Sequence, residues 1–350
     1  MKDIQESFSK FKQFVFDILH NAKSILAEFS IQNIKSMVKF EYNTLRAKLS
    51  DLKGTNWNLA QYHFVAGNFN DGILRFKMLQ RSNYKVMECN YFLGRIYLEK
   101  LNYKDAEKYL SIYLNSNHND YRDEANYCMN ILQDKEIKYI PQSIILQKRN
   151  RLALNLEKTS MDYALLNRYN IIIESLRSIL NPSVKILEIG CYIGILGRIL
   201  KETFVNNIQY LAGSEMGEKV GEIAKSMHIG IKPAYDSVKI CQNILDLGKN
   251  DNTYGIILVP DFLSYYGELT QLFIQIFTSL NDNGVCIIVA RMIDHIITPE
   301  EPKQDFVFIG AIEEFSYSQE YIKNTATACG LKLKSDISIS DEFQLFVFSK

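Results

Sequence analysis

The segment from Val184 to Leu200, VKILEIGCYIGILGRIL, joins an apolar strand to an apolar helix through a glycine-bearing turn. Gly190 and Gly194 permit unusual backbone dihedral angles and a close approach of main-chain groups to a ligand. Turns of this kind follow the first strand of a doubly wound sheet. The segment therefore predicts an α/β fold with a small ligand at the carboxyl end of that strand.

The rest of the C-terminal half alternates between strand and helix patterns. A second predicted strand, IQYLAGSEM, ends near Glu215, where a carboxylate can accept hydrogen bonds from ribose hydroxyls. Further strands are predicted at SVKICQN, YGIILVPDF, VCIIVA and EFQLFVFS, with LNDNG as a turn and FSYSQEYIKNTATACGLKL as the last helix leading into a sixth strand.

Leu187 to Gly194 resemble the first motif of class I S-adenosylmethionine-dependent methyltransferases, which reads hydrophobic, Asp or Glu, hydrophobic, Gly, any, Gly, any, Gly. The middle glycine is Tyr192 in this chain. The resemblance implies a Rossmann-like, seven-stranded methyltransferase domain over residues 183–350, with S-adenosylmethionine as its cofactor. It leaves the methyl acceptor open.

The resemblance also implies which residues hold the cofactor. Glu188 would face the amino group of the methionine moiety and Glu215 would hold the ribose. Asn243 would read the adenine, where the family usually has an acid, or Gln242 if the register differs by one. The complete implied cofactor set is Glu188, Gly190, Cys191, Tyr192, Gly194, Glu215, Met216, Asn243, Ile244 and Pro260.

The loop after the fourth predicted strand supplies the candidate catalytic residues, because the family places this loop beside the transferred methyl group. Asp261 is a candidate general base and Tyr265 a candidate for orienting the acceptor. Other polar residues that could meet an acceptor are Tyr266, Glu268, Arg291 and His295.

The N-terminal half is predicted to be helical and to contain an internal repeat. Leu59-Ala60 and Gly72 recur as Leu93-Gly94 and Ala106 after 34 residues, which is the tetratricopeptide period. This order resembles predicted bacterial methyltransferases with a tetratricopeptide array, whose concave surface would bind a protein or peptide partner unless the array only packs on the C-terminal domain. The expected divisions are N-terminal helices at 1–52, repeats with a capping helix at 53–134, linker and covering helices at 135–182, and the methyltransferase domain.

Composition narrows the functional classes further. Forty basic residues balance 40 acidic ones. The chain therefore has no net charge that would attract nucleic acid or an anionic membrane. No apolar run is long enough to span a membrane, and the first residues have no apolar signal core, so a cytoplasmic location is expected. The six cysteines and five histidines are scattered, which predicts no metal site.

Two alternatives remain open on the sequence. Tyr192, Asn243 and the pair Tyr254-Gly255 depart from the family pattern, as expected for a catalytically inactive scaffold or interaction protein. A nucleotide-dependent oxidoreductase is the third interpretation, although Gly190, Gly194 and Gly197 are spaced as GxxxGxxG rather than GxGxxG.

Overall fold

The structure, a computed structural model, describes residues 51–154, 163–241, 254–293 and 304–350. The predicted helices before residue 51, the adenine-reading candidates Gln242, Asn243 and Ile244, and His295 lie outside the described residues. The chain divides into two compact units, Met1–Leu59 and Ala60–Lys350. The side-chain contacts discussed below lie within the second unit.

The described N-terminal part is built from helices, as predicted. They are α3 (Leu52–Ala66), α4 (Phe69–Arg81), α5 (Val86–Glu99), α6 (Tyr103–Leu114), α7 (Arg122–Leu132) and α8 (Gln142–Leu154). A Cβ atom on Gly94 would lie 2.6 Å from Leu110 Cγ, so α5 and α6 approach as closely as the repeated small residues indicated. The starts of α3 and α5 are 34 residues apart, as are those of α4 and α6. Assignment to the tetratricopeptide family stays a prediction.

The C-terminal part contains a seven-stranded mixed sheet. Its strands are β1 (Val184–Ile189), β2 (Ile208–Glu215), β5 (Ser237–Ile240), β6 (Tyr254–Val259), β7 (Leu280–Arg291), β10 (Lys332–Ser338) and β11 (Phe343–Ser349). They are arranged in the order β10-β11-β7-β6-β1-β2-β5. Neighbouring strands from β5 to β7 are parallel, whereas β11 is antiparallel to both β7 and β10. The Rossmann-like α/β fold implied by the resemblance is confirmed.

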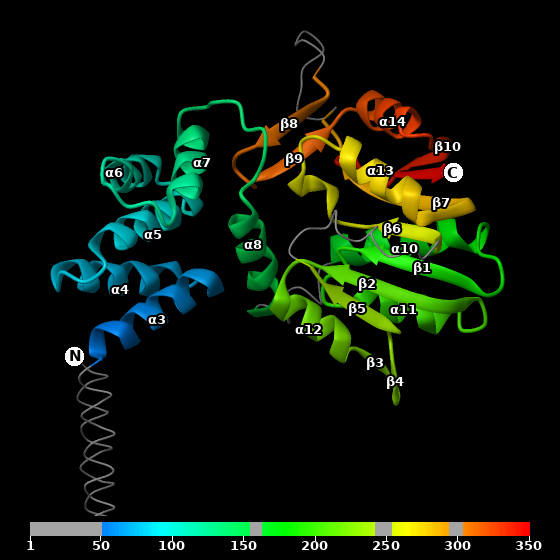
Figure 1. The fold of residues 1–350 in the computed structure, drawn as a ribbon, viewed down its shortest axis with the longest axis horizontal. Helices are drawn as coiled ribbons and strands as arrows, with labels where there is room; N and C mark the ends of the chain where they lie inside the picture. Colours follow the sequence, from blue (N-terminus) through cyan, green and yellow to red (C-terminus); the bar gives the residue numbers. More distant parts are fainter. Residues whose placement is uncertain (1–50, 155–162, 242–253, 294–303) are drawn as a thin grey trace, which may run out of the picture. The chain divides into compact units, whose positions relative to one another are not determined.

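Helices cover both faces of this sheet (Figure 1). They are α10 (Tyr163–Arg177), α11 (Ile195–Thr203), α12 (Glu218–Ser226), α13 (Thr270–Ser279) and α14 (Gln319–Ala328). On one face, Ile186 of β1 shares a buried core with Tyr169 of α10 and Leu196 of α11. On the other, Phe273 of α13 meets Phe348 of β11 with ring centroids 6.1 Å apart. Alternate residues of the strands thus serve two separate cores.

Two short hairpins extend the sheet domain: β3 (His228–Ile229) with β4 (Lys232–Pro233), and β8 (Phe306–Ile309) with β9 (Glu314–Tyr317). The expectation that FSYSQEYIKNTATACGLKL is a helix from its start is corrected, because Phe315 and Tyr317 belong to β9 and are buried. Helix α14 begins only after Ser318, whose hydroxyl accepts a hydrogen bond from the Tyr321 N–H and caps it.

The expected turn LNDNG is also different in the structure. Strand β7 already begins at Leu280, and its register with β6 shifts before Val285 is reached. Asn281, Asp282 and Asn283 are exposed. They form an irregular stretch of β7 where a separate turn was expected.

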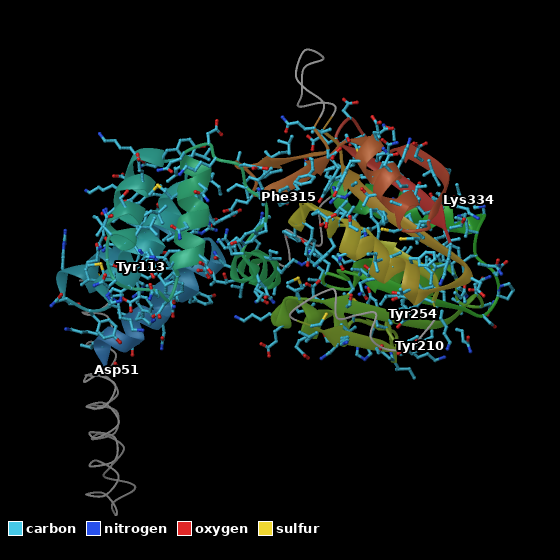
Figure 2. The ribbon with its side chains drawn as sticks, turned by 45° about the horizontal axis from the view of Figure 1, so that its top comes forward. Asp51, Tyr113, Tyr210, Tyr254, Phe315 and Lys334 are labelled. Carbon is cyan, nitrogen blue, oxygen red and sulfur yellow. The ribbon has the colours of Figure 1, made fainter. Side chains whose placement is uncertain are left out.

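At the outer edge of the sheet lies β10, whose residues are all exposed. Figure 2 shows Lys334 of this strand at the margin of the sheet domain. Lys332 and Asp336 flank it at alternate positions, so the edge is charged.

Candidate functional site

The glycine turn lies where the chain order of the sheet reverses. Strands β2 and β5 follow β1 on one side and β6 lies on the other. In open α/β sheets, ligands bind outside the carboxyl ends of the strands at such a switch point. The turn between Ile189 and Ile195 and the loop after Val259 therefore frame the candidate site.

The backbone of this turn is left-handed at three positions. Gly190 has φ +73°, Gly194 has φ +87°, and Tyr192, in place of the family's middle glycine, has φ +56°. A left-handed conformation costs a non-glycine residue roughly 1–2 kcal/mol. Tyr192 thus holds a backbone conformation that favours glycine, and its ring is buried beside the Arg149 guanidinium.

Several expected ligand-facing groups are already paired within the protein. The N–H groups of Gly190 and Cys191 both donate to the Ser214 carbonyl oxygen over 2.9 Å. The Phe262 ring lies against Gly190, where a Cβ atom would come within 2.6 Å of it. Cys191, Met216 and Pro260 are buried.

Glu215 lies at the end of β2, fully buried, with its carboxylate beside the turn. The Tyr192 N–H donates to Oε2 over 3.0 Å, and the N–H groups of Met216 and Gly217 donate to Oε1 over 2.9 and 3.1 Å. Arg149 of α8 donates from Nε to Oε1 over 2.9 Å and from Nη2 to Oε2. Since a carboxylate offers about four lone-pair positions, these five donors leave no acceptor for a ribose hydroxyl.

Arg149 is the functional residue that the sequence analysis missed. Its guanidinium carbon lies 4.9 Å from the Tyr192 ring centroid, 5.6 Å from that of Phe262 and 6.0 Å from that of Tyr265. Burial opposes the charge, but the adjacent Glu215 carboxylate holds the pKa of Arg149 above its usual value. The basic run KRNR in α8 was the available signal, yet Glu215 is 66 residues away and no local pattern links them.

Glu188 is the second acid of the site and is fully buried on the same side of β1 as Tyr235. The Tyr235 hydroxyl donates to Oε2 over 2.7 Å, and Oε1 has no hydrogen-bond partner among the described residues. Burial raises the pKa of Glu188 from 4.5 to about 8, although the tyrosine bond acts in the opposite direction. Glu188 is therefore mainly protonated at neutral pH.

The loop after β6 gathers the candidate catalytic residues near this site. Asp261 is partly exposed and lies 3.4 Å from Nη2 of Arg168 on α10. Tyr265, at the end of the short 3-10 helix η2 (Leu263–Tyr265), is buried, and burial raises its pKa. The Tyr266 hydroxyl approaches Met216 Sδ at 3.8 Å. The catalytic roles of Asp261 and Tyr265 remain predictions.

The remaining acceptor candidates have structural partners. Glu268 accepts a hydrogen bond from the Thr270 N–H over 2.8 Å at the start of α13. Arg291 forms ion pairs with Glu314 and Glu342 and stacks on the Phe343 ring. Among the described residues, no cluster of His, Cys, Asp and Glu could hold a metal ion, and no helix there is long and apolar enough to cross a bilayer.

Part of this chain aligns with solved structures of methyltransferases. A Burkholderia thailandensis 1,6-didemethyltoxoflavin-N1-methyltransferase with bound S-adenosylhomocysteine aligns at 9% identity and a TM-score of 0.44, covering 59% of this chain and 88% of its own. A magnesium protoporphyrin IX methyltransferase from Synechocystis PCC 6803 with bound S-adenosylmethionine aligns at 14% identity and a TM-score of 0.40, covering 69% and 96%.

A third solved structure, the S-adenosylmethionine-dependent methyltransferase from Mesorhizobium loti, aligns at 14% identity and a TM-score of 0.39, covering 51% of this chain and 96% of its own. No protein-family model matches the chain, and no curated protein sequence matches it.

Proposed function

We propose that this protein is an S-adenosylmethionine-dependent methyltransferase whose cofactor site is closed in the described conformation by Arg149. The observation that carries the proposal is the position of Glu215. Its carboxylate lies at the carboxyl end of β2, bound to the Tyr192 N–H of the glycine turn, at the switch point of the sheet. A ribose at this switch point would need such an acceptor.

The cofactor does not fit the site as it stands, because Arg149 and Phe262 fill it and the Glu215 carboxylate is saturated. The main closing group, however, is the side chain of Arg149 from α8. Withdrawal of Arg149 would leave Glu215 with its three backbone donors and about one free acceptor position. The cofactor-binding roles of Glu188, Gly190, Cys191, Gly194 and Met216 belong to that open form.

The acceptor and the role of the helical part are also proposals. Asp261 is partly exposed beside the site, which suits a group that takes a proton from an acceptor, whereas buried Tyr265 suits positioning. The helices from α3 to α7 would recruit a protein or peptide partner. Neither statement identifies a substrate.

A second candidate function is a methyltransferase-fold scaffold without catalysis. A permanent Arg149–Glu215 ion pair favours this function. The pair would then take the place of the bound cofactor, and the folded domain would have no cofactor site. Tyr192 and Phe262 would then serve as packing around the guanidinium.

Calorimetric titration of the full chain with S-adenosylhomocysteine and S-adenosylmethionine separates the two candidates. Arg149→Met should bind both, with affinities in the micromolar range, because methionine cannot bond to the Glu215 carboxylate and its unbranched, flexible side chain can move out of the site. Arg149→Met combined with Glu215→Gln is the matched control and should bind far more weakly. If Arg149→Met stays folded and gives no heat, the scaffold function replaces the proposal; a response to NADH alone would favour the oxidoreductase.

A further inference from the structure

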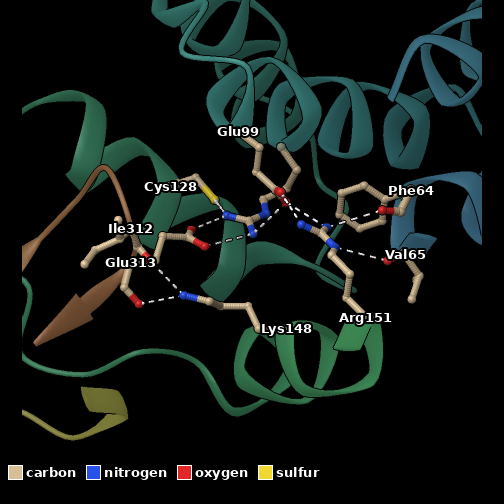
Figure 3. A network of polar contacts seen from close by, with 9 residues as sticks. Phe64, Val65, Glu99, Cys128, Lys148, Arg151, Ile312 and Glu313 are labelled. Carbon is tan, nitrogen blue, oxygen red and sulfur yellow. Dashed lines mark hydrogen bonds and ion pairs between the residues drawn. The ribbon is translucent and has the colours of Figure 1, made fainter. Parts of the chain in front are cut away.

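Helix α3 carries a row of large apolar side chains that are exposed in the structure. The row follows the helical period and consists of Leu52, Leu59 and Tyr62, which are 59%, 40% and 52% exposed. The carboxyl end of α3 is bound elsewhere, because the carbonyl oxygens of Phe64 and Val65 accept hydrogen bonds from Arg151 of α8 (Figure 3). Single exposed apolar side chains are common, but a row along one helix face indicates a contact surface.

The equivalent face of α5 is covered by the helix that precedes it in the chain. Leu93 and Ile96 lie 34 residues after Leu59 and Tyr62 and are fully buried. A Cβ atom on Gly72 of α4 would come within 3.2 Å of Ile96 Cδ1, so α4 lies directly on this face. Since repeated units bury their apolar faces against neighbouring units, the same face of α3 calls for a preceding helix in the same place.

Two further contacts show that α4 runs along α5. Phe76 stacks on Phe92 with ring centroids 5.1 Å apart, and Gln80 Nε2 donates to Asn90 Oδ1 over 2.9 Å. Only residues 82–85 join the two helices. A link of this length holds consecutive helices side by side as an antiparallel pair.

The sequence before α3 repeats the pattern of α4. The buried positions of α4 are Gly72, Phe76 and Leu79, and α6 buries the same positions one repeat later with Ala106, Leu110 and Tyr113. The residues 34 positions before those of α4 are also apolar and are Val38, Tyr42 and Leu45. The counterpart of α4 as a whole is residues 35–47, and residues 48–51 join this segment to α3 as 82–85 join α4 to α5.

We propose that residues 35–47 dock as a helix along the face of α3 that carries Leu52 and Leu59, in the way that α4 covers α5. The segment and both leucines lie within the first compact unit, Met1–Leu59. A link as short as 48–51 keeps the segment at a high local concentration beside α3, so it occupies the face in preference to a second copy of the chain. The first end of the helical part is then closed by the chain itself.

Leu59→Lys in the full chain tests this contact, because a lysine ammonium group on the face would have to lose its water when the segment docks. Leu74→Lys is the matched control. Leu74 is 60% exposed on α4, outside the buried row of that helix, and the equivalent position of α6 already carries a lysine, Lys108. Tyr42→Lys tests the contact from the side of the segment and serves if Leu59→Lys folds poorly.

Amide hydrogen exchange is the first measurement. In the parent, the amides of residues 35–47 should exchange about tenfold or more slowly than in an unstructured peptide. Leu59→Lys should remove most of this protection, whereas Leu74→Lys should keep it. Unprotected exchange of 35–47 in the parent would overturn the inference, and so would protection that both Leu59→Lys and Tyr42→Lys leave unchanged.

Dilution separates docking within one chain from association between two copies. The protection of residues 35–47 should stay the same over a roughly hundredfold dilution, because an intramolecular contact does not depend on protein concentration. Sedimentation velocity over the same range should show no concentration-dependent dimer that Leu59→Lys abolishes. Protection that disappears on dilution together with such a dimer would assign the α3 face to a second copy and overturn the inference.

Discussion

Two buried polar groups at the closed site lack hydrogen-bond partners among the described residues: Oε1 of Glu188 and Nη1 of Arg149. An unsatisfied buried donor or acceptor destabilises the folded state by about 1–3 kcal/mol. The hydrogen bonding of these two side chains is therefore incomplete, which destabilises the closed site. Protonation of Glu188 relieves part of the strain by removing its charge.

Glu188→Gln should change how stability depends on pH. Because the pKa of Glu188 rises from 4.5 to about 8 on folding, the folded protein holds a proton that the unfolded chain has lost between these values. The free energy of unfolding should then fall as pH rises through this range, by at most about 5 kcal/mol. Urea unfolding at about pH 5 and about pH 9 should show a smaller fall in Glu188→Gln. Equal falls in both proteins would contradict the raised pKa.

Gly194→Ala should destabilise the protein more than Gly230→Ala. Both glycines have positive φ, +87° and +60°, but a Cβ at Gly194 would lie 3.1 Å from the Ala224 Cα, whereas nothing lies within 4 Å of one at Gly230. The expected losses are roughly 2 kcal/mol or more and about 1 kcal/mol. Chemical denaturation of the two variants measures the difference. Equal losses would mean that contact with α12 does not constrain the turn.

At the scale of elements, α8 contributes Arg149 to a buried ion pair with Glu215 of β2. The Arg149 and Glu215 side chains are 1% and 0% exposed. Breaking a buried pair by removing one partner leaves an uncompensated charge, which is far more destabilising than removing both.

A double-mutant cycle on this pair should show strong coupling. Arg149→Met and Glu215→Gln should each destabilise the protein by about 3–5 kcal/mol, and the double variant by less than their sum. The exposed pair Arg198–Glu202, four residues apart on α11, is the reference and should couple by about 0.5 kcal/mol or less. Thermal and urea unfolding provide the free energies. Additive effects at Arg149 and Glu215 would show that the two side chains are not coupled.

The elements themselves were largely readable from the sequence, because strands such as IQYLAGSE and FQLFVFS are apolar runs between breaking residues. The hairpin β8–β9 was not, since Phe315 and Tyr317 are followed directly by a helical pattern and only the capping Ser318 marks the boundary. The cofactor-binding and catalytic roles of the candidate site residues stay predictions, and the pairing of Glu215 with Arg149 was not predicted. Glu215 and Arg149 are 66 residues apart and come together only in the tertiary fold, so no local sequence pattern predicts their ion pair.

For the whole second unit, the ion pair between Arg95 and Glu313 predicts cooperative unfolding. Buried Arg95 pairs with Glu313 across 218 residues of chain, so the helical part and the sheet domain share a desolvated contact. Differential scanning calorimetry should give one transition with equal calorimetric and van't Hoff enthalpies. Arg95→Met should lower its midpoint by several degrees. Two well-separated transitions in the parent would show that the parts unfold independently.

The charged edge strand affects how copies of the molecule behave toward one another. An open strand edge presents unpaired backbone groups to which strands of other chains can add. Along β10, Lys332, Lys334 and Asp336 are exposed, the register with β11 shifts between Leu333 and Ser335, and Asp336 is also paired with Lys323 of α14. Charged side chains and a bulge both oppose the addition of another strand at such an edge. The edge strand β10 therefore opposes edge-to-edge association of sheets from different molecules, even at high protein concentration.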